Sequence, residues 1–465
     1  MNNCSYKSCK ITINDIAIKR TIEVNKFFIR CATSVFLLTL STAVYAAVAP
    51  AKMTLQEAVA TGILKSPDYG QAAQDSLATR EVLFQAKGLN LPTLSLSTET
   101  GPEYENYLGI PAKNQDMWHS RASLSLSQLL FDGWGTMNQI RSQKAKVESS
   151  VKRAGEAAEF AGLDSIESFL DVLRQRELLE ISRSNVDAHL KILDMIEAGA
   201  KAGTVTQGDV AQIKARLAQS RATVASSEEN LRKAESLFAQ KVGDVPGDLA
   251  DPVIPRSNLS ANVDEAVHVA LLHNPTLAVT KADVDAAAAD QAGASALLYP
   301  RVDLQANESI ADNISGIPGN NQSRTILAVA KWNLYHGGAD KARMRETLYR
   351  TASAKERRNQ SLRQVEKEVR DTWAGMVSAA DRAKDYEEQI SANEKVVSVY
   401  LDQFNMSRRT LLDVLDAQNE LFISRSNNLD AVYAEKFAVF RVLALQGRLL
   451  DTLNVPKPRE AMLEH

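Results

Sequence analysis

Two carboxylates in the last quarter of the chain have a spacing that could matter for function. Asp413 and Asp416 stand three residues apart, so on a helix they lie on one face. Acidic groups gathered on one surface attract cations and repel anions. Taken alone, the same spacing is more typical of an ordinary solvated helix face, so its meaning depends on the elements that hold the pair.

Signatures of enzymatic chemistry are absent from the sequence. It contains no Gly-x-x-x-x-Gly-Lys-Ser/Thr, no Gly-x-Ser-x-Gly and no His-Glu-x-x-His motif. His268 and His273 stand five residues apart, which does not place them on one helix face, and we expect surface residues rather than metal ligands. The sequence therefore predicts a protein that is not an enzyme and has no cofactor and no metal site.

The composition excludes several broad classes of protein. The 465 residues include 54 Lys and Arg against 57 Asp and Glu, and 45% are hydrophobic. A disordered chain would be less hydrophobic, and a basic nucleic-acid binder would carry a clear excess of cations. Only 21 glycines and 13 prolines are present, which argues against an all-β protein built from many short strands and turns.

Residues 1–46 have the pattern of a secretory signal peptide. Lys26 and Arg30 precede a short apolar run, and small residues end it at Ala46. The run is too short for a membrane-spanning helix, which needs about 20 apolar residues. Residues 1–25 form an unusually long and polar stretch ahead of such a signal, so a translation start further along the chain is an alternative. The exported chain would contain no cysteine, because all three precede the cleavage site: Cys4, Cys9 and Cys31.

The rest of the chain repeats itself once. Segments near the start of each half match without a gap, and the match continues with a slightly shorter offset further along. We therefore expect a first structural repeat over 47–255, a second over 256–455 and a short tail over 456–465. The matching segments include Leu55-Gln-Glu-Ala-Val59 with Val263-Asp-Glu-Ala-Val267, Leu130-Phe-Asp-Gly133 with Leu334-Tyr-His-Gly337, and Gly208-Asp-Val210 with Leu412-Asp-Val414.

Long helices dominate each predicted repeat. An opening helical stretch ends before a proline, two strands follow, and the repeat closes with a very long helix and a shorter one. The longest stretch has about 63 residues without proline, which gives about 95 Å at 1.5 Å per residue. This length favours a cylinder of helices over a globule. The expected helices are 54–87, 136–198 and 206–241 in the first repeat, and 262–296, 339–403 and 410–446 in the second.

The strands predicted between these helices are amphipathic. Leu94 and Leu96 alternate with serines, and the second repeat has strands near 300–312 and 323–335, with a break in alternation near 327–332 that indicates a bulge. Each strand is long enough to cross a bilayer when tilted. Four strands cannot close a barrel, and an open edge in lipid would leave backbone groups unpaired. Closure therefore requires several chains, and this reasoning leaves two or three copies open.

Three segments follow one another along the chain: Thr54-Leu-Gln-Glu-Ala-Val59, Leu129-Leu-Phe-Asp-Gly133 and Phe404-Asn-Met-Ser-Arg-Arg-Thr-Leu-Leu-Asp-Val-Leu-Asp-Ala-Gln-Asn-Glu-Leu421. This ordered set resembles the TolC family of outer-membrane channel-tunnels. The resemblance extends over about residues 53–454. It implies a mainly α chain with a membrane β-barrel: a long α-helical barrel plus four transmembrane strands per chain, with a homotrimer closing a 12-stranded barrel in outer-membrane lipid. The tunnel would extend through the periplasm of a Gram-negative bacterium.

The resemblance assigns roles to particular residues. Asp413 and Asp416 match the aspartates of the pore constriction, where mutual repulsion would raise their pKa values. Asp209, Arg409 and Phe404 match the links that hold the family's inner helices closed, with Phe404 in place of a tyrosine. Two turns correspond to the expected contacts with a periplasmic adaptor. They comprise Gly203, Thr204, Val205, Asn405, Met406, Ser407 and Arg408.

The resemblance also implies a function. The chain would be the passive outer-membrane exit duct of a tripartite export system, opened by docking to an adaptor (membrane fusion protein) and an inner-membrane transporter. We expect type I protein secretion with an ABC transporter, because the second turn looks most like that branch and a lipidation site is missing. A multidrug efflux pump with an RND transporter is the alternative. A periplasmic adaptor or an all-helical enzyme fits the two equal repeats poorly, and no nucleic-acid partner is expected.

Overall fold

The structure, a computed structural model, describes residues 52–107, 113–315 and 317–462. The chain divides into two units, Met1–Ala51 and Lys52–His465, and only the second contains described residues. The predicted signal peptide over 1–46 therefore lies outside the described residues.

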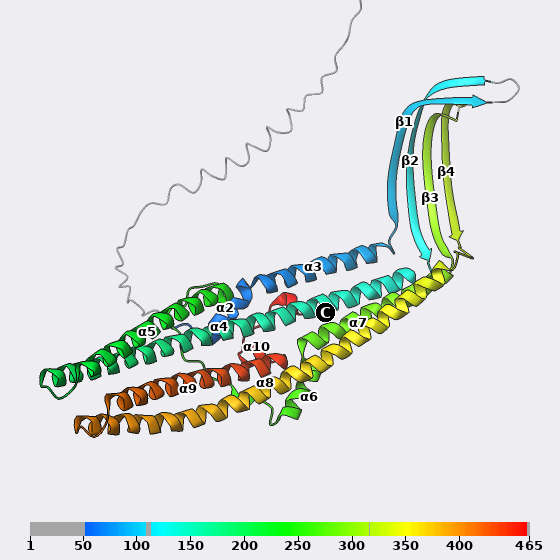
Figure 1. Cartoon of the computed structure of the whole chain (residues 1–465). Coiled ribbons are helices and arrows are strands. Elements are labelled where there is room, and N and C mark those ends of the chain that lie inside the picture. Colours follow the sequence, from blue (N-terminus) through cyan, green and yellow to red (C-terminus); the bar gives the residue numbers. More distant parts are fainter. Residues whose placement is uncertain (1–51, 108–112, 316, 463–465) are drawn as a thin grey trace, which may run out of the picture. The chain divides into compact units, whose positions relative to one another are not determined.

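The same order of elements occurs twice along the chain (Figure 1). Each half contains two shorter helices, two strands, one helix of 67 residues and one returning helix. A helix of that length extends over about 100 Å. The first half consists of α2 (Leu55–Lys65), α3 (Pro67–Gly88), β1 (Thr93–Tyr107), β2 (Lys113–Phe131), α4 (Gly135–Lys201) and α5 (Gln207–Val242). The second half consists of α6 (Val263–His273), α7 (Pro275–Ala294), β3 (Arg301–Ile314), β4 (Ile317–Lys331), α8 (Ala339–Asn405) and α9 (Leu411–Leu445), followed by α10 (Leu449–Thr452). Short 3₁₀ helices are η1 (Arg256–Asn258), η2 (Ser295–Leu298) and η3 (Arg459–Ala461).

The opening stretch of each repeat is two helices, and the prediction of one continuous helix was wrong. The break lies before Pro67 in the first repeat and before Pro275 in the second, where proline is the first residue of the new helix. The preceding side chain caps that helix: Ser66 accepts a hydrogen bond from the backbone of Tyr69, and Asn274 does the same for Leu277.

The four strands form one antiparallel sheet in the order β1-β2-β3-β4. Directly paired residues share a face because side chains alternate along each strand. One row across the sheet is Leu94, Leu126, Ala306 and Ile326, and the next row, on the opposite face, is Ser95, Ser125, Asn307 and Thr325. We call the side with the first row the apolar face and the other the polar face, although the apolar face also carries the ion pair of Glu308 with Arg324.

The sheet has irregularities at two places. Register shifts occur between Leu129 and Phe131 in β2 and between Asp312 and Ile314 in β3. The pairing of β4 is continuous over the segment where alternation breaks, so the bulge predicted there was wrong. Within the described residues, β1 and β4 each pair on one side only, which leaves two open edges.

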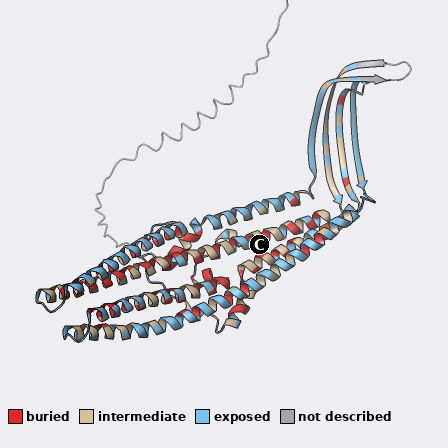
Figure 2. Ribbon diagram, in the orientation of Figure 1, coloured by how far each residue is buried: buried red, intermediate tan, exposed pale blue. Residues whose placement is uncertain are grey.

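Helix α4 is the central element of the helical part. It packs against α5 and α9, and α9 in turn packs against α8, so the long helices follow one another in the order α5, α4, α9, α8. The main apolar core lies where α2, α4, α5, α9 and α10 meet. Phe169, Phe238 and Phe440 are fully buried there, and the rings of the first two are 6.3 Å apart. Figure 2 shows buried residues on the packed helix faces, with the edge strands β1 and β4 largely exposed and the middle strands β2 and β3 mostly at intermediate burial.

Within the described part of the chain, none of the helices combines the length and the apolar character needed to cross a membrane. The same residues contain no cluster of His, Cys, Asp and Glu suited to a metal ion.

Candidate pore constriction

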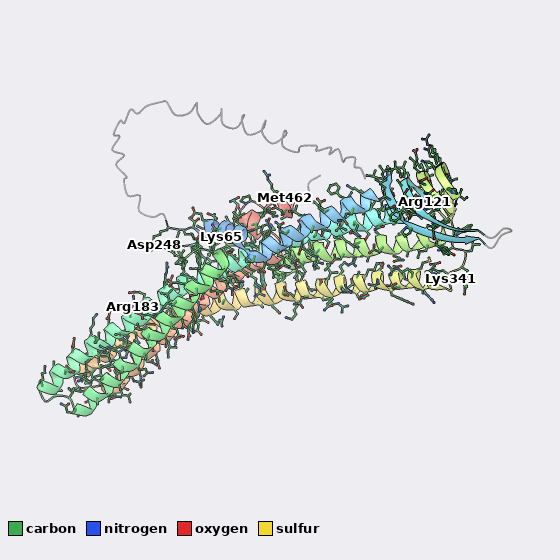
Figure 3. The ribbon with its side chains drawn as sticks, turned by 90° about the horizontal axis from the view of Figure 1, so that it is seen from above. Lys65, Arg121, Arg183, Asp248, Lys341 and Met462 are labelled. Carbon is green, nitrogen blue, oxygen red and sulfur yellow. The ribbon has the colours of Figure 1, made fainter. Side chains whose placement is uncertain are left out.

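Two helical hairpins, α4–α5 and α8–α9, end in turns that have the same backbone geometry. These turns lie at the ends of the long helices away from the sheet; Figure 3 marks Arg183 on α4 and Arg121 on β2 as reference points. Gly203 has a φ of 77° and Ser407 a φ of 58°, both in the left-handed region. The predicted adaptor-contact residues are exposed except Val205, which is partly buried.

Each turn leads into a helix through a capping box. Asp209 Oδ2 accepts hydrogen bonds from the Thr206 amide at 3.0 Å and hydroxyl at 2.8 Å, while the Thr206 hydroxyl accepts from the Asp209 amide. Asp413 and Thr410 repeat this arrangement, with 3.2 Å and 2.8 Å for the two bonds to Asp413 Oδ2. A Thr-x-x-Asp pattern before a helix is visible in the sequence, so these two threonines could have been predicted.

The capping contacts lower the pKa of Asp413. The main cause is the hydrogen bond from the Thr410 hydroxyl, followed by the Thr410 backbone amide and the positive charge of Arg409. Repulsion between neighbouring carboxylates was expected to raise the pKa of Asp413. Within one chain, the capping contacts have the opposite effect.

A small apolar cluster joins the two hairpins just behind the turns. It contains Ile192 and Ile196 of α4, Val210 and Ile213 of α5, and three residues of α9. These three are Leu411, Val414 and Leu415. Phe404 packs against this tip cluster and is partly buried, so an aromatic ring without a hydroxyl contributes apolar contact at this position.

Asp416 is bound by a residue that the sequence did not single out. Arg216 Nη2 donates to Asp416 Oδ1 at 3.1 Å, which connects α5 of the first repeat to α9 of the second. Both side chains are partly exposed, at 33% and 55%. Nothing in the sequence pattern relates two residues that are 200 positions apart.

Arg409 has its contacts within its own hairpin. Its Nε donates to Gln403 Oε1 at 3.0 Å, its guanidinium lies 4.0 Å from the centre of the Tyr400 ring, and its Nη1 is 3.8 Å from Asp413. Among the described residues Asp209 and Arg409 do not pair with each other within one chain. The structure thus brings Arg409 and Asp413 together, while Asp209 contacts Thr206 in the capping box of α5.

Further from the turns, α9 is firmly anchored to α4. Arg174 binds Asp171 and Asp430, and the Tyr433 hydroxyl donates to Glu177 at 2.6 Å. Burial, together with the bond to Glu177, raises the pKa of Tyr433. Asp171, Arg174, Asp430 and Tyr433 help to line a groove of about 370 Å³ formed by residues of α4, α5 and α9.

A model of the family described as outer membrane efflux protein matches residues 62–243 and 266–448. The chain belongs to this family. The outer membrane efflux protein BepC of Brucella suis biovar 1 (strain 1330) is 24% identical over 74% of this chain and 75% of its own length. The alkaline protease secretion protein AprF of Pseudomonas aeruginosa is 22% identical over 86% of this chain and 87% of its own length. Outer membrane protein TolC of Escherichia coli (strain K12) is 21% identical over 80% and 77%.

Solved structures have the same fold as this outer membrane efflux protein. The outer-membrane channel OprN superimposes with a TM-score of 0.76 at 17% identity, over 84% of this chain and 89% of that chain. VceC of Vibrio cholerae superimposes with a TM-score of 0.73 at 18% identity, over 86% and 95%. The predicted TolC-like fold is therefore confirmed.

Membership of the family confirms further predictions. The protein is an outer-membrane protein of a Gram-negative bacterium and extends into the periplasm. The channels of this family are passive, so the prediction that the protein is not an enzyme is confirmed. TolC-family channels are trimers that work with adaptors and inner-membrane transporters.

Proposed function

We propose that three copies of this chain form the outer-membrane exit duct of a tripartite export system. The observation that carries the proposal is the four-stranded sheet with one apolar face, one polar face and two open edges. Pairing β4 of one copy with β1 of the next satisfies both edges, places the apolar face toward lipid and surrounds a polar channel. Three copies supply the 12 strands of the family's barrel.

The duct closes at the hairpin turns in this proposal. Asp413 and Asp416 of the three copies line the constriction and give it a preference for cations. Helices α5 and α8 lie at opposite ends of the order α5, α4, α9, α8, so the turn after α8 of one copy meets the start of α5 of the next. Arg409 can therefore reach Asp209 of a neighbouring copy and act, with Phe404 packing behind it, as a latch that docking releases.

The exposed turns are the proposed docking points for a periplasmic adaptor. The first hairpin presents Gly203 and Thr204, which are exposed, and Val205, which is partly buried. The second hairpin presents four exposed residues. Those four are Asn405, Met406, Ser407 and Arg408. Crosslinking at these turns followed by identification of the captured proteins tests the assignment, with an ABC transporter and its adaptor as the expected partners and an RND pump as the alternative.

Type I protein secretion is the cargo pathway that we propose. The support is the second turn and the match to AprF, a protein named for protease secretion, over 86% of this chain. Multidrug efflux remains the second candidate because BepC and the solvent efflux protein SrpC of Pseudomonas putida are named for efflux. A deletion strain should lose export of a tagged adhesin or toxin and keep its drug susceptibility. Unchanged secretion with heightened drug sensitivity would decide for efflux.

A further inference from the structure

We propose that Arg216 is a positioning and selectivity-determining residue of the constriction, which holds α9 against α5 through Asp416 and neutralises that carboxylate while the duct is closed. The proposal rests on the proposed function in one respect, namely that Asp416 lines the pore. Arg216 belongs to the first repeat and Asp416 to the second, so the contact joins the two hairpins of one chain.

The position of this ion pair in the fold is its first supporting observation. Across the described residues, it is the one hydrogen bond or ion pair that links α5 to α9. The other polar contacts of α9 with other elements go to α4, to α8, to the segment between the repeats or to Asn274 between α6 and α7. Examples are Tyr433 with Glu177 and Arg425 with Glu394. Near the turns, α9 is therefore tied to α5 by Arg216 and by the tip cluster.

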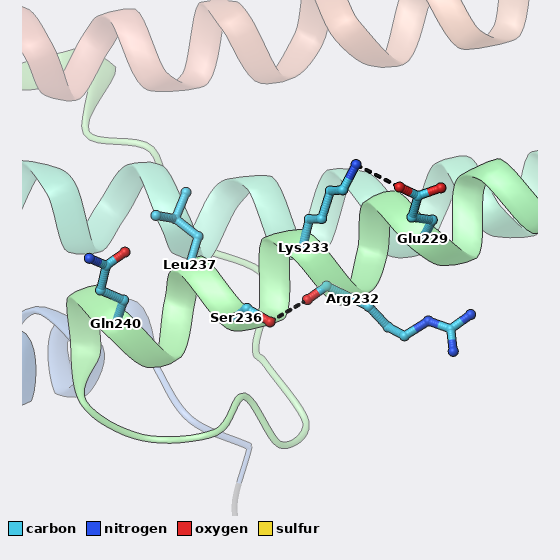
Figure 4. Close-up of a pocket in the computed structure, with 6 residues that line it drawn as sticks. All are labelled: Glu229, Arg232, Lys233, Ser236, Leu237 and Gln240. Carbon is cyan, nitrogen blue, oxygen red and sulfur yellow. Dashed lines mark hydrogen bonds and ion pairs between the residues drawn. The ribbon is translucent and has the colours of Figure 1, made fainter.

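The other cations of α5 differ from Arg216 in their partners. Lys233 binds Glu229 of the same helix at 2.7 Å (Figure 4). Lys214, two residues before Arg216, binds Glu197 of α4 at 2.9 Å and so acts within one hairpin. These pairs stabilise a helix or a hairpin, and neither holds the two hairpins together.

The electrostatic consequence is that both constriction carboxylates have a cationic neighbour in the closed chain. Asp416 is bound at 3.1 Å, and Asp413 lies 3.8 Å from Arg409. A ring of six carboxylates is thereby partly neutralised. Movement of α9 away from α5 breaks the Arg216 contact, so opening exposes Asp416 and strengthens the preference for cations.

The strength of the pair suits a contact that has to break. An ion pair between partly exposed side chains contributes little to stability, and solvent replaces it readily. The anchors of α9 on α4 lie further from the turns, at Arg174 and Tyr433. Separation of the end of α9 from α5 therefore breaks the Arg216–Asp416 pair and the α5–α9 contacts of the tip cluster, while the rest of the helix stays in place.

Single-channel recordings of the full-length protein in planar bilayers test the proposal. Arg216→Gln should raise the closed-state conductance and the K⁺/Cl⁻ permeability ratio by about two- to fivefold, the range expected for one partly exposed ion pair. The exchanged pair Arg216→Asp with Asp416→Arg should restore the low closed-state conductance. Lys214→Gln is the matched control, because it removes a cation and an ion pair from the same helix, and it should behave as wild type.

Three results would overturn the proposal in distinguishable ways. If Asp416→Asn changes the ion selectivity and Arg216→Gln behaves like Lys214→Gln, Asp416 lines the pore but Arg216 has no role in it. If Asp416→Asn also leaves selectivity unchanged, the proposed constriction itself is wrong. Failure of the exchanged pair to restore the closed state, with trimers intact on gels, would likewise contradict a direct Arg216–Asp416 link.

Discussion

Ser407 occupies in the second hairpin the left-handed position that Gly203 occupies in the first, with φ values of 58° and 77°. For a residue with a Cβ atom this conformation costs about 1–2 kcal/mol, while glycine adopts it freely. The sequence deviates from the glycine often found at this turn, and the backbone nevertheless keeps the same shape.

Ser407→Gly should therefore stabilise the second turn by about 0.5–1 kcal/mol, after allowing for the greater freedom of glycine in the unfolded chain. Hydrogen exchange of the turn amides measures the effect. The reciprocal change Gly203→Ser should destabilise the first turn, and its effect comes from the backbone alone because no atom would contact the added Cβ. Equal hydrogen-exchange rates of the turn amides in both variants and in wild type would contradict the proposed backbone strain at this position.

Thr410→Ala should affect both the structure and the electrostatics of the proposed constriction. Loss of an N-cap hydroxyl costs about 0.5–2 kcal/mol of helix stability. The same hydroxyl is the main cause of the lowered pKa of Asp413, so that pKa should rise. Cation selectivity should then be lost at a higher pH on acidification than in wild type.

Thr206→Ala is the control for this change, because Thr206 makes the equivalent capping box with Asp209 in the first repeat. It should cost a similar free energy without changing the pH dependence of selectivity. The same change in pH dependence in both variants would mean that protonation of Asp413 does not determine the pH dependence of ion selectivity.

Arg409→Ser should loosen the closed state. It removes the contacts with Gln403, Tyr400 and Asp413 and, in the proposed trimer, the link to Asp209 of a neighbour. We expect a several-fold higher single-channel conductance. Arg408→Ser, which removes the adjacent exposed arginine, should leave the conductance unchanged; equal effects of both variants would indicate a general charge effect at the turn.

Glu159 should make the stability of the protein depend on pH. Its side chain is buried in α4 at 4% exposure, and burial raises its pKa to about 7, because it outweighs the opposing effects of Lys457 and of the Leu449 and Leu450 backbone. The folded state therefore binds the proton more tightly than the unfolded state. Stability is greatest below the unfolded pKa near 4.5 and falls as the pH rises through the folded pKa of about 7, by about 3 kcal/mol in total.

Glu159→Gln should remove this loss, so that the variant is more stable than wild type at pH 8 and similar at pH 5. Denaturation of the detergent-solubilised protein at the two pH values measures it. Glu148→Gln, an exposed position of the same helix, should keep the wild-type dependence. An unchanged slope in Glu159→Gln would show that this carboxyl is ionised at neutral pH in the folded protein.

Periodicity and internal repetition predicted most of the fold. The two-fold order of helices and strands, the very long helices and the two-faced strands all follow from local patterns that the structure retains. Local patterns also misled, because a helical period continues across Ser66 and Asn274, although the prolines after them start new helices. The bulges lie elsewhere than predicted because register depends on the partner strand.

The candidate site was only partly predictable. Asp413 and Asp416 came from resemblance, and the capping role of Asp413 was visible in its spacing from Thr410. Arg216 was not, because its contact with Asp416 exists only when two distant helices lie side by side. Contacts of this kind depend on tertiary packing and leave no trace in the local sequence.

Reversal-potential measurements on the channel with Asp413→Ala and Asp416→Ala together test the central claim most directly. The claim is that three copies form a passive duct whose narrowest point carries these carboxylates. Wild type should prefer cations, and the double variant should lose that preference, with a clearly higher Cl⁻ permeability and the same trimeric state. Ion selectivity equal to wild type in the double variant would contradict the claim, because the constriction would then lie elsewhere.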